Sequence, residues 1–135
     1  MEKVNSASKN VYKKSVNAEA LRQAKSLEAQ GCAFVSLMDE EGTFLYLSQP
    51  HLAAYGRPLS DLIGHKLEEF VVPEDVPHML LALQDTLLNE ESVTIGLRVV
   101  TADGSIRRIR GSARQVSRNA DGSAIILGNS VIVAQ

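Results

Sequence analysis

The feature that most restricts the fold of this chain is a pair of Asp-Gly turns in its last third. Asp103-Gly104 and Asp121-Gly122 separate three segments of strand length, at residues 92–100, 105–116 and 123–134. An Asp-Gly pair between two such segments is the strongest short-range signal for a β-hairpin, because both residues tolerate the positive φ angles of the turn. The last third is therefore predicted to form three consecutive antiparallel strands.

Two further strands are predicted upstream, in short apolar runs at residues 32–39 and 43–48. Residues 50–72 then show short helical turns interrupted by Pro and Gly, and Pro73 opens the longest helix, over residues 74–90. This order predicts an α+β fold with an antiparallel sheet and the helices gathered on one face.

The segment 17–31 predicts an N-terminal amphipathic helix. Asn17 suits its N-cap and Gly31 suits its end, whereas the polar residues 1–10 are expected to be frayed. The apolar side chains of this helix lie along one stripe, formed by Val16, Ala20, Leu21, Ala24 and Leu27.

The long helix also has one apolar stripe, which we expect to face the core. At 100° per residue, His78 and Asp85 lie on the opposite side of the helix. The stripe consists of Val76, Met79, Leu80, Leu83 and Leu87.

Length and composition predict a single soluble domain. The 135 residues divide into a disordered start and helix at 1–31 and a folded body at 32–135. The single Cys excludes an internal disulfide, and no apolar run approaches the roughly 18 residues of a membrane span. A cytoplasmic protein without membrane contact is therefore expected.

No set of residues has the spacing of a catalytic or metal site. His51, His65 and His78 lack ligand spacing, and Cys32 begins an apolar strand, where an inert thiol is expected. Residues 97–135 carry six arginines against two acidic residues but no aromatic side chain to stack on bases. We therefore predict neither an enzyme, nor a metal site, nor a nucleic-acid partner.

Five short motifs follow one another along the chain, and their order and spacing are informative: Tyr55-Gly56, Asp61-Leu62-Ile63-Gly64, Pro73-Glu74-Asp75, Arg98 and Asp103-Gly104. This ordered set, over residues 32–133, resembles a PAS domain, the small sensory and dimerisation module of signalling proteins. The resemblance implies a five-stranded sheet with strand order 2-1-5-4-3. The chain departs from the family at Ser48, Arg108 and 132–134, where Asn, Trp and Asp-Ile-Thr are usual.

The resemblance also indicates which cofactors to consider. In the flavin-binding light-oxygen-voltage branch, the photoreactive Cys would fall at Leu67 and the flavin-bonding amides at Val99, Ile109 and Ser130. Leu67 cannot form a thiol adduct and the flavin edge would lose its partners, so flavin is not expected. The haem-binding branch uses a His on or near the long helix; His78 points away from the apolar stripe, which leaves haem as a lower-ranking alternative.

Period-2 alternation directs one set of strand residues toward the helices, and several of them are small. Such a face either lets the helices pack closely or leaves a cavity, and both alternatives remain open. A cavity there would be mainly apolar and would suit a small, mainly apolar ligand. Its candidate lining residues are Phe34, Ser36, Met38, Tyr55, Leu83, Val99, Ile109, Gly111, Ala113, Gly128 and Ser130.

The other sheet face carries an apolar patch that is too large to stay exposed in a monomer. The N-terminal helix is its obvious cover, from the same chain or from a second subunit. We predict a homodimer whose interface comprises Val16, Ala20, Leu21, Ala24, Leu27, Ile125, Leu127, Val131 and Val133.

The predicted function is a sensory module that binds a small ligand or a partner and signals by dimer rearrangement to a downstream output domain or partner protein. The alternative is an interaction domain with a filled core and no ligand.

Overall fold

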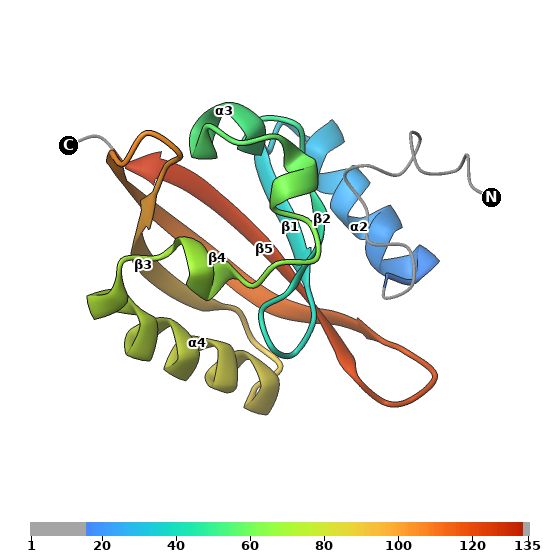
Figure 1. The fold of residues 1–135 in the computed structure, drawn as a ribbon. Helices are drawn as coiled ribbons and strands as arrows, with labels where there is room; N and C mark the ends of the chain where they lie inside the picture. The colour runs from blue at the N-terminus through green and yellow to red at the C-terminus, as the bar shows by residue number, and fades with distance from the viewer. Residues whose placement is uncertain (1–15, 134–135) are drawn as a thin grey trace.

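The computed structural model describes residues 16–133, which form one sheet with helices on both sides (Figure 1). The elements are α2 (Ala18–Ala29), β1 (Phe34–Met38), β2 (Phe44–Leu47), α3 (His51–Tyr55), the 3₁₀ turns η1 (Leu59–Asp61), η2 (Leu67–Phe70) and η3 (Pro73–Asp75), α4 (Val76–Leu88), β3 (Val93–Val100), β4 (Ile106–Arg118) and β5 (Ala124–Val133). All neighbouring strands are antiparallel, in the order β2-β1-β5-β4-β3, which confirms the predicted fold. The frayed start predicted at residues 1–10 lies outside the described residues. Within residues 16–133, no helix combines the length and the apolarity needed to cross a membrane.

The two predicted Asp-Gly turns connect β3 to β4 and β4 to β5. Gly104 and Gly122 have φ angles of 88° and 89°, which only glycine adopts without strain. The carboxylate of Asp103 accepts a hydrogen bond of 3.0 Å from the backbone N–H of Ser105, and Asp121 makes the equivalent bond. These local bonds fix both turns and hence the register of the three long strands.

A bulge in β2 interrupts the simple alternation that the sequence predicts. Leu37 pairs with Tyr46 and Met38 pairs with Phe44, which leaves Leu45 as an extra residue. Leu45 and Tyr46 therefore both join the cluster on the α2 side, while Phe44 joins the cluster on the α4 side. All four residues of β2 are consequently buried.

Helix α2 covers part of the outer face of the sheet, where it packs against β1, β4 and β5 (Figure 1). Asn17 caps it by accepting a 2.8 Å hydrogen bond from the backbone N–H of Ala20. Ala20 and Ala24 are fully buried, because their methyl groups let the helix approach the strands closely, and the Tyr46 hydroxyl donates to Glu28. The buried strand residues of this cluster are Val35, Leu37, Leu45, Tyr46, Ile125 and Leu127.

Helix α4 crosses the opposite face along β3 and β4 and is tied to the sheet at both ends. At its start, the Asp75 carboxylate accepts hydrogen bonds from the backbone N–H of Arg98 (2.9 Å) and from its guanidinium (2.8 and 3.1 Å). At its end, Gln115 Nε2 donates to the backbone oxygens of Thr86 and Leu87 at 3.1 and 2.9 Å. These bonds set the separation between helix and sheet.

The predicted stripe of α4 is wrong at one position. Leu80 is 43% exposed, whereas Met79 and the unpredicted Thr86 are buried. Tethering at both ends rotates the contact face toward Met79 and Thr86, which are seven residues apart and therefore aligned. His78 and Asp85 are exposed, as predicted.

Candidate ligand-binding cavity

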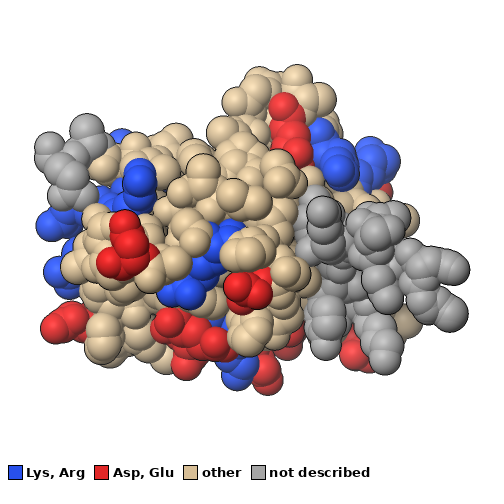
Figure 2. All heavy atoms as spheres, turned by 45° about the horizontal axis from the view of Figure 1, so that its top comes forward, with Lys and Arg blue, Asp and Glu red and all other residues tan. Residues whose placement is uncertain are grey.

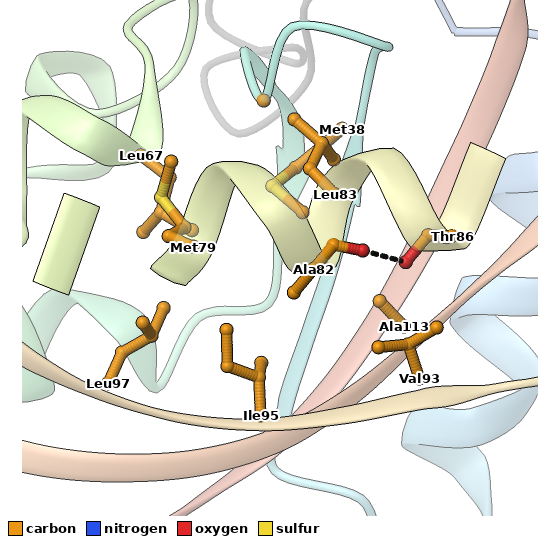
Figure 3. A pocket seen from close by; sticks show the side chains of 11 residues that line it. Met38, Leu67, Met79, Ala82, Leu83, Thr86, Val93, Ile95, Leu97 and Ala113 are labelled. Atoms are coloured by element: carbon orange, nitrogen blue, oxygen red, sulfur yellow. Dashed lines mark hydrogen bonds between the residues drawn. The ribbon is translucent and has the colours of Figure 1, made fainter. Parts of the chain in front are cut away.

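A first cavity of about 50 Å³ lies between α4 and the sheet (Figure 3). Met79 and Leu83 project into it from the helix, and Ile95 faces them from β3. The hydroxyl of Thr86 donates a 2.9 Å hydrogen bond to the backbone oxygen of Ala82, so it is satisfied within the helix. The first cavity is therefore essentially apolar.

A second cavity of about 80 Å³ lies over the centre of the sheet and shares lining residues with the first, including Met38, Leu67 and Ala113. Most of the predicted lining residues surround it: Ser36, Met38, Tyr55, Ile109, Gly111, Ala113, Gly128 and Ser130. Of the others, Leu83 lines the first cavity, and Phe34 and Val99 line a third hollow of about 10 Å³ beside His51 and Tyr55. The structure thus brings all the predicted residues to three adjoining spaces.

Two glycines on the sheet surface lower the floor of the second cavity. A Cβ atom on Gly128 would lie 2.6 Å from Ser36 Oγ on the adjacent strand. A Cβ atom on Gly111 would lie 2.9 Å from Ser130 Cβ and 3.2 Å from the backbone oxygen of Asn129. All three distances are shorter than ordinary van der Waals contact, so larger side chains at these positions would displace their neighbours and fill the cavity.

His51 belongs to this site, although the sequence analysis considered it only as a metal ligand. It is 5% exposed and lines both the second cavity and the third hollow. Its ring lies 5.4 Å from that of Phe34 and 6.0 Å from that of Tyr55, between ring centroids. The spacing of four residues from Tyr55, which places both on one side of a helical turn, is the signal that could have found it.

The contacts of His51 define its tautomer. Nδ1 lies 3.0 Å from the backbone oxygen of Ser48, which can only accept, so Nδ1 carries the proton. Ser48 Oγ donates to the backbone oxygen of Ala33 at 2.6 Å and accepts from the backbone N–H of Val35 at 2.9 Å. Burial lowers the pKa of His51 to about 4 against the opposing effect of the Ser48 bond. At neutral pH the ring is therefore uncharged and Nε2 presents a lone pair.

Tyr55 supplies a second polar group to the lining. It is 5% exposed and packs edge-on against Phe44 and Phe70, with ring centroids 6.4 and 6.1 Å apart. Burial raises the pKa of its phenol, which therefore keeps its proton. Within residues 16–133 neither the Tyr55 hydroxyl nor His51 Nε2 has a hydrogen-bond partner. The site thus combines an apolar lining with one acceptor and one hydroxyl, both unpaired.

Comparison with known proteins identifies the fold. A family model described as the PAS fold matches residues 44–129. The chain belongs to the PAS family. No curated protein matches it.

Solved PAS structures share this architecture at low sequence identity. Drosophila melanogaster Cycle PAS-B with bound ethylene glycol has a TM-score of 0.69 and 20% identity, over 74% of this chain and 99% of that one. The PAS domain of an HTR-like protein from Haloarcula marismortui has a TM-score of 0.64 and 19% identity, over 84% and 95%. A light-oxygen-voltage domain studied with a flavin analogue has a TM-score of 0.68 and 22% identity, over 88% and 90%. Identities this low establish the shared fold alone.

Several positions that carry the PAS resemblance have clear structural roles. Asp75 and Arg98 form the pair that ties α4 to β3. Gly56 and Gly64 have φ angles of 66° and 85°, and Gly56 ends α3. Ser48, which replaces the usual Asn, bonds to β1 and holds the ring of His51. The departure at Ser48 therefore supports the cavity wall indirectly, through its contact with His51.

The predicted interface residues of this PAS domain divide into two groups. Ala20, Ala24, Ile125 and Leu127 are buried by contacts within the single chain, so the structure corresponds to the same-chain alternative for the cover. Val131 is 54% exposed. Val16, Leu21, Leu27 and Val133 are half-buried. Homodimerisation remains a prediction, and the part of this face that α2 leaves open centres on Val131.

Among residues 16–133, neither the face drawn in Figure 2 nor the metal-binding side chains show a second site of obvious chemistry. On the face drawn in Figure 2, basic and acidic side chains are interspersed, without a continuous patch of one sign. In the part of the chain that the structure describes, no three His, Cys, Asp or Glu residues are grouped so that they could hold a metal ion. The cavity is therefore the best candidate for a functional site.

Proposed function

We propose that this PAS domain is a sensory module in signal transduction and that it binds a small, neutral, mainly apolar molecule in the second cavity. The observation that carries the proposal is an interior space of about 80 Å³, adjoining one of about 50 Å³, with two unpaired polar groups in its wall. Small hydroxylated molecules, ethylene glycol and glycerol, are bound in structures of Cycle PAS-B. That precedent supports a ligand of similar character here.

Size and charge restrict the ligand. Of the described residues that line the second cavity, none is Asp, Glu, Lys or Arg, so a multiply charged molecule would be buried without a counter-ion. Each space alone is smaller than the roughly 150 Å³ that accommodates benzene in an engineered cavity, whereas the two adjoining spaces together approach that volume. The ligand we propose is therefore no larger than one aromatic ring, and a ligand of that size would extend from the second cavity into the first.

The same considerations argue against flavin and haem as resident cofactors. A tricyclic isoalloxazine or a porphyrin is far larger than the space available. Leu67 stands at the position of the photoreactive Cys and lines the cavity as an aliphatic side chain, while His78 lies on the exposed side of α4. We propose a module without a cofactor.

Signal transmission would use β5, whose residues alternate between the two faces of the sheet. Gly128 and Ser130 face the cavity, whereas Leu127 contacts α2 and Val131 is exposed on the outer face. A ligand that displaces this strand would move the surface that faces α2 and a second subunit. We propose that dimer rearrangement through this surface reaches a downstream output domain or partner protein.

The proposed module acts without catalysis and in a reducing, cytoplasmic environment. Cys32 packs with the cluster on the α2 side of the sheet, whereas His51 lies on the other side. His65 contacts Glu69 at 3.1 Å, away from any thiol. A nucleophile and a base are therefore not brought together by these residues.

A thermal-shift screen of small neutral compounds tests ligand binding. Ala113→Leu is the matched variant, since Ala113 lines both cavities and a leucine would fill them. We expect some compounds to raise the Tm of the wild-type domain and none of these to raise that of a folded Ala113→Leu domain. A ligand at 100 times its Kd stabilises by about 2.7 kcal/mol, which a thermal scan detects readily.

A ligand-free interaction domain is the second candidate, and the small cavity volumes favour it, because native interiors retain minor voids. A screen without any stabilising compound would support this candidate over the sensor.

Sedimentation velocity over a range of concentrations tests dimerisation. We expect Val131→Asp to weaken self-association, whereas Leu81→Asp, at a 62% exposed site on α4, leaves it unchanged. A domain that stays monomeric at the highest concentration would contradict the proposed dimer.

A further inference from the structure

The unpaired groups of His51 and Tyr55 provide information about the ligand that the cavity volume does not. Buried polar groups in proteins nearly always have a hydrogen-bond partner, because burial without one costs free energy. His51 and Tyr55 are each 5% exposed, lie four residues apart on α3 and both line the second cavity. Among residues 16–133, the fully buried side-chain polar atom without a partner is Arg57 Nε, so His51 Nε2 and the Tyr55 hydroxyl keep some accessible surface. A molecule in this cavity is in a position to satisfy both.

The chemistry of each group defines what the molecule must offer. His51 Nε2 can only accept, because the Ser48 carbonyl holds the ring proton at Nδ1. The hydroxyl of Tyr55 can either donate or accept. A ligand hydroxyl meets both requirements, since it donates one hydrogen bond and accepts another.

The ring of His51 is held in the orientation that directs this acceptor. Nδ1 is bonded to Ser48, whose hydroxyl is itself fixed by Ala33 and Val35, and Phe34 packs at right angles to the ring. Rotation of the imidazole would break the Ser48 bond. The acceptor is therefore preorganised, which favours ligands that match it.

We infer that the ligand is a neutral molecule of about one-ring size whose hydroxyl donates a hydrogen bond to His51 Nε2 and accepts one from Tyr55. This ligand class rests on the proposed function and deepens it. Hydrocarbons, ethers and ketones are disfavoured, because they have no donor and would exclude water from Nε2 without replacing its hydrogen bond. Phenol is the simplest molecule with these properties.

Binding of phenol and of toluene provides the test, since toluene replaces the hydroxyl by a methyl group of similar size. The Kd values of both are measured by calorimetry for the wild-type domain, for His51→Phe and for Tyr55→Phe. We expect the wild-type domain to prefer phenol, and His51→Phe to reduce the phenol-to-toluene preference by about tenfold. Tyr55→Phe should reduce it by a smaller factor, and His78→Phe, at an exposed site, should leave it unchanged.

Two readouts keep the test independent of folding defects. Tyr55→Phe removes a hydroxyl without a partner among the described residues, so its ligand-free Tm should not fall below that of the wild-type domain. In nitrogen-15 NMR spectra, phenol should shift the Nε2 resonance of His51 toward that of a hydrogen-bonded nitrogen, whereas toluene should not.

The outcomes separate this inference from the proposed function. Equal preference for phenol and toluene in the wild-type domain and His51→Phe overturns the inference but leaves a ligand-binding cavity. Tighter binding of benzoate than of phenol overturns it as well and points to Arg107, which lines the third hollow. Binding of none of the three probes contradicts the proposed function itself.

Discussion

The buried His51 makes the stability of this domain depend on pH in a defined window. The perturbation is acidification from pH 7 to pH 4, compared between the wild-type domain and His51→Phe. The ordinary pKa of histidine is 6.5, and burial lowers that of His51 to about 4 in the folded state. Because the unfolded state binds the proton more tightly, acid favours unfolding.

The magnitude follows from the two pKa values. Above pH 6.5 the ring is neutral in both states, and the contribution of His51 to stability is fully present. As the pH falls toward 4, the unfolded state gains a proton that the folded state lacks. The loss is about 2 kcal/mol at pH 5 and about 3 kcal/mol at pH 4.

Urea unfolding at several pH values measures this loss. Asp75, Asp103 and Asp121, whose carboxyl pKa values are lowered by hydrogen bonds, also lose stability in acid. They titrate alike in both proteins, so the difference between wild type and His51→Phe isolates the histidine. His78→Gln, which changes an exposed ring, is the matched control and should follow the wild-type curve.

The result that would refute this reasoning is a difference in unfolding free energy between wild type and His51→Phe that stays constant from pH 7 to pH 4. An NMR titration in which His51 protonates near pH 6.5 in the folded domain would do the same. Either result would mean that the ring is exposed to solvent and does not form part of the cavity wall.

Three further predictions concern the packing of the strands and helices. Gly111→Ala should destabilise the domain by roughly 1–3 kcal/mol, because the new methyl group would meet Ser130 Cβ and a backbone carbonyl, which cannot move away. Gly128→Ala should cost less despite its shorter contact, because the Ser36 hydroxyl that it meets can rotate away. Chemical denaturation of both variants measures the difference. Asp75→Asn should weaken the pairing with Arg98 by about 1 kcal/mol and increase hydrogen exchange at the start of α4. Ala24→Glu should detach α2 from the sheet and lower the free energy of unfolding by roughly 3 kcal/mol or more, because it places a charge at a fully buried position. The detached helix should become sensitive to limited proteolysis, and an unchanged digestion pattern would argue against the observed packing.

The positions of the strands and the turns were largely predictable from the sequence. Asp103-Gly104 and Asp121-Gly122 specify their hairpins through local backbone conformation and local hydrogen bonds, which neighbouring residues alone determine. Period-2 alternation then assigned Gly111 and Gly128 to the helix side, because side-chain direction in a strand is also a local property. The arrangement of strands came from the family resemblance and not from the periodicity.

The candidate site was predictable only in part. The small residues of the sheet were found because their positions follow from alternation. His51 was missed: its spacing of four residues from Tyr55 indicates a shared side of α3, but its burial depends on the contact of α3 with Phe34, a residue distant in sequence. Thr86 was missed for a related reason: the rotation of α4 is set by bonds from Asp75 and Gln115 to other elements.

By itself, the sequence determined where each strand and turn forms and which strand residues share a face. Only the tertiary structure decided how far α4 stands from the sheet, that α2 covers the outer face of its own chain, and that His51 and Tyr55 of α3 line an apolar space. These properties depend on contacts between residues far apart in the chain. Several alternative packings of the same elements have comparable free energies, so no short segment specifies which packing forms.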